Sequence, residues 1–104
     1  AEINAAVAAI QFPQSDRNNP YNHRPDVFIY HGNGTNECRD YCNNAADAWP
    51  IIVANRIALM PDASEHDTSQ WWDAQSSCQK HGIQYQSNPL RAVMICYLMM
   101  QESE

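Results

Sequence analysis

Residues 88–100 read NPLRAVMICYLMM, which is the strongest structural signal in the sequence. Asn88 is a good helix cap, and Pro89 suits the first helical turn, where its missing N–H would have no intrahelical partner. Apolar side chains then recur at helical spacing and cover nearly the whole circumference. We expect a helix over residues 89–101 and, because it is apolar on nearly all sides, we expect it at the centre of the fold.

Two further helices are predicted in the first half of the chain. An Ala-rich stretch with apolar residues at helical spacing predicts one over residues 2–11. The other follows a cap at Thr35 or Asn36 and extends to residue 49, because an apolar stripe occupies positions i, i+3, i+4, i+7 and i+11. The stripe consists of Cys38, Tyr41, Cys42, Ala45 and Trp49. It places Trp49 in the core.

Two more helices are predicted after Pro50, which either kinks the preceding helix or begins the next one. Residues 51–60 are almost wholly apolar and indicate a buried helix, with a strand as the alternative. Residues 64–81 begin with capping and acidic side chains and end in Lys-His-Gly, signals typical of a helix start and stop. Trp71 would lie on the apolar side of that helix, with Trp72 half covered.

The two segments between the first two predicted helices, residues 13–25 and 26–30, show no helical periodicity. Residues 13–25 contain three prolines and hardly any apolar side chain, so we expect a long surface loop. Residues 26–30 are β-prone and form either a strand or an extended buried segment. Pairing of residues 26–30 with residues 83–86 would add a minor two-stranded β element.

The length of the chain bounds the architecture. At 104 residues, with 44% hydrophobic and 17% charged residues, residues 1–104 fit a single domain that can bury a core. The predicted fold class is therefore all-α: a small bundle of four to five helices around residues 89–101, cross-linked by two disulfides.

The disulfide prediction rests on four cysteines in a short chain. Cys38 and Cys42 would share one helix face, so we expect them to bond to Cys78 and Cys96 rather than to each other. One alternative is a zinc site formed by Cys38, Cys42, Cys78 and His81. Another is four buried thiols that pack as small apolar side chains.

Charge and composition bear on partners and location. The net charge of −6 is spread without a basic block, which argues against binding nucleic acid or an anionic membrane surface. No apolar run is long enough to cross a bilayer. The amide-rich, lysine-poor composition, the cysteines and a chain that begins at Ala1 suggest a secreted or periplasmic protein after signal-peptide removal. Asn33 stands in a glycosylation sequon.

Catalysis has little support in the sequence. His66 lies beside Asp67 and Glu65, but neighbouring helical residues point about 100° apart and do not readily bond each other. His31 lies in a Gly-containing turn, where an exposed histidine is the simpler interpretation. Nucleophile elbows, phosphate loops and zinc-protease motifs are absent from the sequence. We predict no catalytic residue, metal or cofactor.

Binding is the better-supported hypothesis. Tyr and Trp are enriched in interfaces, and the surface candidates are Tyr21, Tyr30 and Trp72, together with the loop of residues 13–25. The anionic surface favours a protein partner with a basic patch. The predicted function is therefore a small acidic protein-interaction module. The alternatives are a helical carrier of a small apolar ligand and a small secreted hydrolase that uses His66 or His31.

Overall fold

The computed structural model describes residues 2–18, 26–32, 34 and 36–102. Within these residues the chain forms three helices and six strands. Their order is α1 (Glu2–Gln11), β1 (Asp16–Asn18), β2 (Val27–Tyr30), β3 (Asn36–Arg39), α2 (Ala45–Asn55), β4 (Ala58–Ala63), β5 (Gln70–Gln75), β6 (Gly82–Gln86) and α3 (Pro89–Glu102). The predicted all-α bundle is therefore wrong.

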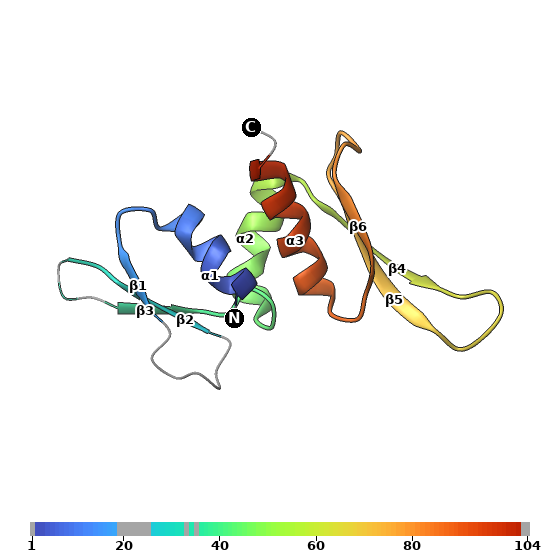
Figure 1. Ribbon diagram of the computed structural model, residues 1–104, viewed down its shortest axis with the longest axis horizontal. Coiled ribbons are helices and arrows are strands. Elements are labelled where there is room, and N and C mark those ends of the chain that lie inside the picture. The colour runs from blue at the N-terminus through green and yellow to red at the C-terminus, as the bar shows by residue number, and fades with distance from the viewer. Residues whose placement is uncertain (1, 19–25, 33, 35, 103–104) are drawn as a thin grey trace.

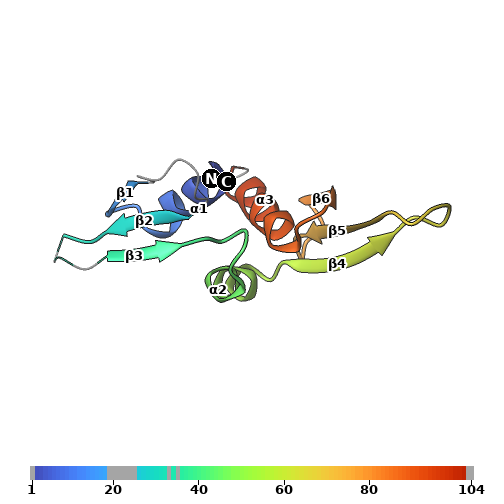
Figure 2. The same ribbon diagram turned by 90° about the horizontal axis from the view of Figure 1, so that it is seen from below.

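The strands form two separate antiparallel sheets, with orders β1-β2-β3 and β4-β5-β6. The helices lie between the sheets (Figure 1). The molecule measures 53 × 31 × 20 Å, with a radius of gyration of 14.9 Å, against about 13 Å for a compact domain of this size. Figure 2 shows that the β4–β5 hairpin extends outward at one end and accounts for much of this length.

The prediction for α3 is confirmed in type, extent and position. Asn88 caps the helix: its Oδ1 accepts hydrogen bonds from Leu90 N at 3.0 Å and Arg91 N at 3.2 Å. The helix contacts α1, α2 and all three strands of the second sheet. Its buried residues are Ala92, Val93, Met94, Cys96 and Tyr97. These side chains form the centre of the core.

Two other predictions hold at the level of single elements. The helix over residues 2–11 is α1. Residues 27–30 are a strand, β2, but it pairs with β1 and β3 and not with residues 83–86. The predicted loop of residues 13–25 is interrupted by β1, and residues 19–25 lie outside the described part of the chain.

The helix predicted over residues 36–49 is wrong. Residues 36–39 form β3, and a turn follows in which the backbone amides of Asn43 and Asn44 donate to Asp40 O. Helix α2 begins only after Asn44, whose side chain accepts from Ala46 N at 3.0 Å. The apolar stripe is thus divided among a strand, a turn and a helix, and Trp49 is 63% exposed rather than in the core.

The helix predicted over residues 51–60 is correct only for residues 51–55, which belong to α2. Helix α2 continues through Pro50 and ends at Arg56, which takes a left-handed φ of 55° and donates its N–H to Ile52 O. Pro50 costs this helix one intrahelical hydrogen bond. Residues 58–63 are β4, so the strand alternative was correct for the second half of the segment.

The helix predicted over residues 64–81 is replaced by a hairpin. Side chains that suit helix caps also stabilise turns: Ser64 Oγ accepts from His66 N at 3.1 Å, and Asp67 Oδ1 accepts from Ser69 N at 2.8 Å. The backbone amide of Ser64 donates to Ser69 O and closes the β4–β5 turn. Strand β5 then occupies the middle of the predicted helix.

The predicted disulfides are wrong as well, because none of the four cysteines, all of which lie in the described part of the chain, forms a disulfide. Cys38 lies on a strand, where its thiol donates to Asp26 Oδ2 at 2.7 Å. Cys42 is buried in the turn after β3, so the two do not share a helix face. Cys78 is exposed beyond β5, whereas Cys96 is buried in α3.

Candidate functional site

The predicted partner-binding residues are not brought together. Tyr30 ends β2 in the first sheet, and Trp72 lies on β5 in the second sheet; both are half-buried. The helices separate the two sheets (Figure 1). Tyr21 and the sequon residue Asn33 lie outside the described residues. The structure thus offers Tyr30 and Trp72 as parts of two different surfaces.

His66 does not form the acid–base pair considered from the sequence. It is exposed in the β4–β5 turn, and its backbone amide donates to Ser64 Oγ. The carboxylate of Asp67 is engaged by Ser69, whose backbone hydrogen bond lowers the pKa of Asp67. Asp67 therefore stabilises the turn instead of orienting an imidazole.

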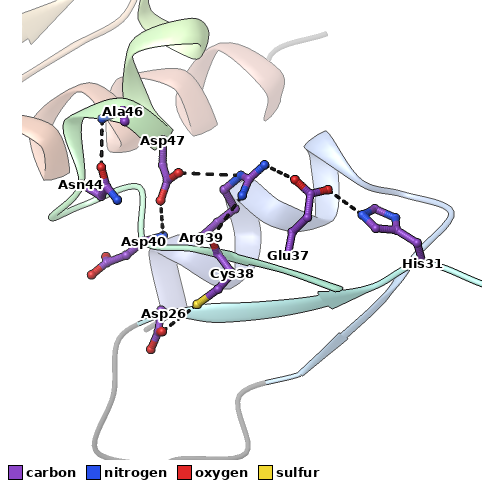
Figure 3. A network of polar contacts seen from close by, with 9 residues as sticks. All are labelled: Asp26, His31, Glu37, Cys38, Arg39, Asp40, Asn44, Ala46 and Asp47. Carbon is purple, nitrogen blue, oxygen red and sulfur yellow. Dashed lines mark hydrogen bonds and ion pairs between the residues drawn. The ribbon is translucent and has the colours of Figure 1, made fainter. Parts of the chain in front are cut away.

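His31 belongs to a network of polar side chains across the first sheet (Figure 3). Its Nε2 lies 2.6 Å from Glu37 Oε2, and its Nδ1 lies 3.0 Å from Ser15 Oγ. Arg39 binds the other oxygen of Glu37 and reaches Asp47 of α2, with 3.8 Å between Nε and Oδ1. The hydrogen bond with His31, reinforced by the charge of Arg39, lowers the pKa of Glu37.

This network ties β3 to α2 and borders a hollow of about 300 Å³. Phe12, Pro50 and Ile51 contribute the apolar part of the lining, and Arg39 and Asp47 the polar part. Ser15, His31 and Glu37 form a hydroxyl–imidazole–carboxylate chain, the arrangement that activates a nucleophile in hydrolases. His31 is therefore the histidine on which a catalytic hypothesis can rest.

A second candidate site lies on the sheet formed by β4, β5 and β6. Directly paired residues of antiparallel strands point to the same face, and the register pairs Met60 with Asp73 and Asp62 with Trp71. The opposite face carries Ala74, which is buried in the core. Met60, Asp62, Trp71 and Asp73 therefore lie on the face directed away from the core, which we call the outer face.

Tyr85 completes the outer face through an irregularity in the β5–β6 ladder. The register shifts between Trp72 and Ala74, and Tyr85 takes a left-handed φ of 63°. Its backbone amide donates to Asp73 Oδ1 at 3.3 Å, and its ring packs on Trp71 with centroids 4.9 Å apart. Tyr85 nevertheless remains 70% exposed. Such a backbone costs about 1–3 kcal/mol in a residue with a side chain and is often found at functional sites.

A groove of about 580 Å³ opens where the β5–β6 ladder is irregular, and part of its lining belongs to the outer face. Its lining includes Met60, Asp73, Gln79, His81, Gln84 and Tyr85. Met60 is 41% exposed, whereas Asp73 is only 8% exposed. The groove thus combines accessible apolar and aromatic side chains with an almost fully buried carboxylate.

The sequence interpretation missed the residues that distinguish these surfaces. It placed Trp71 and Trp49 in the core of helices, and it assigned no role to Tyr85. The adjacent aromatic residues in QWWDAQ at residues 70–75 were an available strand signal, because aromatic side chains are enriched in strands. Trp49 and Val53, 63% and 55% exposed, lie one turn apart on α2; their exposure follows from a helix that starts later than predicted.

Metal binding and membrane insertion receive no structural support. Within residues 2–18, 26–32, 34 and 36–102, no three His, Cys, Asp or Glu side chains gather to hold a metal ion. The zinc alternative is therefore wrong for Cys38, Cys42, Cys78 and His81. None of the helices in these ranges has the length and apolar character needed to span a membrane.

The fold and its surfaces define a small acidic protein of mixed helices and antiparallel sheets, with an exposed aromatic sheet face. Residues 1–101 match the family described as Bacteriophage P22, NinX. The chain belongs to this family. No curated protein and no solved structure matches it.

These findings correct the predicted description of a secreted, disulfide-bonded helical protein. The cysteines form no disulfide in the described residues, the fold is mixed, and the family gives no support to secretion. The secreted or periplasmic location stays a prediction that rests on composition, and the disulfides no longer support it. The carrier alternative assumed a helical bundle, which this fold is not.

Proposed function

We propose that this protein is a protein-binding module whose outer face binds a basic surface of a partner protein. The observation that carries the proposal is the exposed aromatic centre of that face, Tyr85 on Trp71, held by a strained backbone. Exposed aromatic and Met side chains are typical of interface centres. Strain of this kind has no benefit for folding, so a binding role gives it a reason.

The charge of the surroundings indicates the chemistry of the partner. Asp62, Glu65 and Asp67 are all exposed on the β4–β5 hairpin, which projects from the body of the molecule (Figure 2). The chain as a whole carries a net charge of −6. A basic partner would be attracted to this hairpin, and association would slow as salt screens the charges.

The test compares variants as baits in a bacterial lysate. We expect wild type and Trp49→Ala to retain the same protein and Tyr85→Gly to lose it. Trp49 is the matched control because it is also exposed and aromatic but lies on α2. Glycine at residue 85 removes the ring and accepts the left-handed backbone, so the fold should be retained.

The captured protein is then purified and its affinity measured by calorimetry at several salt concentrations. We expect Tyr85→Gly to weaken binding at least tenfold and added salt to lower the affinity. Retention that is equal in all three baits, or binding that is indifferent to salt, would overturn the proposal.

The Ser15–His31–Glu37 chain favours a second candidate function, a small hydrolase. Its distances of 3.0 Å and 2.6 Å fit hydrogen bonds from hydroxyl to imidazole and from imidazole to carboxylate. A serine-directed phosphonate should then label Ser15 in wild type and fail to label it in His31→Ala. Ser77→Ala, an exposed serine in the β5–β6 turn, should leave labelling unchanged. Absence of labelling at Ser15 would exclude this function.

A further inference from the structure

We infer that the groove of the outer face is a recognition pocket for an arginine side chain of the partner. This inference rests on the proposed function and adds to it the chemical group that the surface selects. Three features support it: the few hydrogen bonds made by the Asp73 carboxylate, the aromatic rings near that carboxylate, and the backbone of Tyr85, which holds its ring beside Asp73.

Asp73 carries an incompletely paired carboxylate in the groove. The residue is 8% exposed, and it lies on the central strand of the sheet. Among the described residues its carboxylate accepts a single hydrogen bond, the 3.3 Å contact from Tyr85 N, and it has no basic side chain as an ion-pair partner. A carboxylate offers about four acceptor positions. The second oxygen of Asp73 is not among the buried side-chain atoms that lack a partner, so it is accessible from the groove and can accept hydrogen bonds from a cationic group of a ligand.

The rings beside Asp73 favour a guanidinium over an ammonium group. Tyr85 and Trp71 are in contact at an interplanar angle of 45°, and the ring of Tyr85 is largely exposed. A guanidinium is planar, so it stacks on an aromatic ring while its N–H groups bind a carboxylate in a bidentate manner. Lysine has no such plane. The groove volume of about 580 Å³ is ample for the side chain and its flanking backbone.

The pocket is formed before any ligand arrives. The left-handed backbone of Tyr85 and its hydrogen bond to Asp73 join the aromatic wall to the carboxylate. A preorganised site loses less conformational entropy on binding than a flexible one. The contact between Asp73 and Tyr85 is thus the structural basis of the pocket, and each residue can be tested separately.

The experiment titrates the labelled protein with blocked tripeptides and follows its backbone amide resonances by NMR. The probes are Gly-Arg-Gly, Gly-Lys-Gly and Gly-citrulline-Gly, in which citrulline keeps the shape of arginine without its charge. We expect saturable shifts at residues 73 and 83–86 with the arginine peptide. Binding of the lysine peptide should be at least fivefold weaker, and the citrulline peptide should give no shifts there.

Two variants separate a pocket from general charge attraction. Asp73→Asn keeps an acceptor for Tyr85 N but removes the charge, so it should abolish the shifts. Glu65→Gln removes one charge from the exposed hairpin and should leave them unchanged. Shifts confined to the hairpin, or equal losses in both variants, would overturn the pocket.

The same experiment distinguishes this inference from the proposed function. A partner whose capture depends on Tyr85, combined with no arginine shifts at residue 73, would refute the arginine pocket and leave the protein-binding function standing. Arginine-specific shifts without any captured partner that depends on Tyr85 would refute the proposed function while retaining the pocket.

Discussion

Replacing Asn4 by alanine should be among the most destabilising polar substitutions in the chain. Asn4 is 1% exposed on α1 and joins this helix to the turn after β3. Its Nδ2 donates to Asp40 Oδ1 at 2.7 Å, and its Oδ1 accepts from the buried Cys42 N at 3.1 Å. Alanine removes both bonds and leaves the amide of Cys42 without this acceptor.

The magnitude follows from the two bonds. An unpaired buried N–H costs about 1–3 kcal/mol, and a hydrogen bond to a charged group contributes about 1.5–3 kcal/mol. Asp40 keeps its two 3.1 Å bonds from Asn43, which reduces the second loss. We therefore expect Asn4→Ala to lower the free energy of unfolding by about 3 kcal/mol, equivalent to about 12 °C or more in Tm.

The control is Asn43→Ala, which removes an asparagine bonded to the same carboxylate. Asn43 is exposed, so its loss should cost no more than about 1 kcal/mol. Urea unfolding followed by circular dichroism measures both variants. If both variants lost the same free energy of unfolding, the loss would come from the shared partner Asp40, and the argument that burial of Asn4 determines the destabilisation would be refuted.

Three further predictions concern α3 and the adjacent turn. Val93→Ala and Tyr97→Ala, at positions 0% and 3% exposed, should each destabilise by about 2–5 kcal/mol, and near-neutral denaturation curves for both would contradict the central position of α3. Asn88→Ala should cost about 1 kcal/mol through loss of the cap and somewhat more through loss of its 2.7 Å bond to Cys42 O, with Asn88→Ser recovering the cap alone. Burial raises the pKa of Tyr41 to about 12, above the usual value of about 10. The contribution of Tyr41 to the free energy of unfolding should therefore be unchanged below pH about 10 and should decline as pH rises toward about 12. Tyr41→Phe should flatten that decline in pH-dependent unfolding without loss of stability at pH 7, because the Tyr41 hydroxyl has no hydrogen-bond partner among the described residues.

The parts of the fold that could be predicted are those whose local signals have one meaning. Residues 89–102 combine a cap, a first-turn proline and an apolar sequence too long for a strand, so only a helix fits them. The Ala-rich α1 is similar. In both, propensity, pattern and capping agree, and tertiary contacts did not need to override them.

The wrong predictions share one physical cause: each pattern was compatible with two structures. Asp62, Ser64 and Asp67 bear oxygens that cap a helix or close a turn, and the cross-strand pairing that decides between them is not visible in local sequence. Residues 36–49 show helical spacing by coincidence, because Cys38 belongs to a strand and Tyr41 to a turn. Loss of this helix also removed the geometric basis for the disulfides.

The outer face could not be predicted from the sequence, because it depends on the unusual backbone of Tyr85. Left-handed backbone is normally assigned to Gly or Asn, and a tyrosine at residue 85 gives no sign of it in sequence. The register shift between β5 and β6 and the hydrogen bond from Tyr85 N to Asp73 accompany that conformation, and both depend on tertiary structure.

An unusual backbone conformation therefore separates Tyr85 from Trp49, the two aromatic residues that are exposed in the described part of the chain. Trp49 lies on α2 directly before Pro50 and takes no left-handed φ, and the late start of this helix accounts for its exposure. Tyr85 is exposed at a conformational cost that folding alone does not require. If the outer face binds the partner, Tyr85→Gly should lose affinity while the fold is retained or stabilised. Opposite changes in affinity and stability at one residue are the result that a purely structural role for Tyr85 cannot produce.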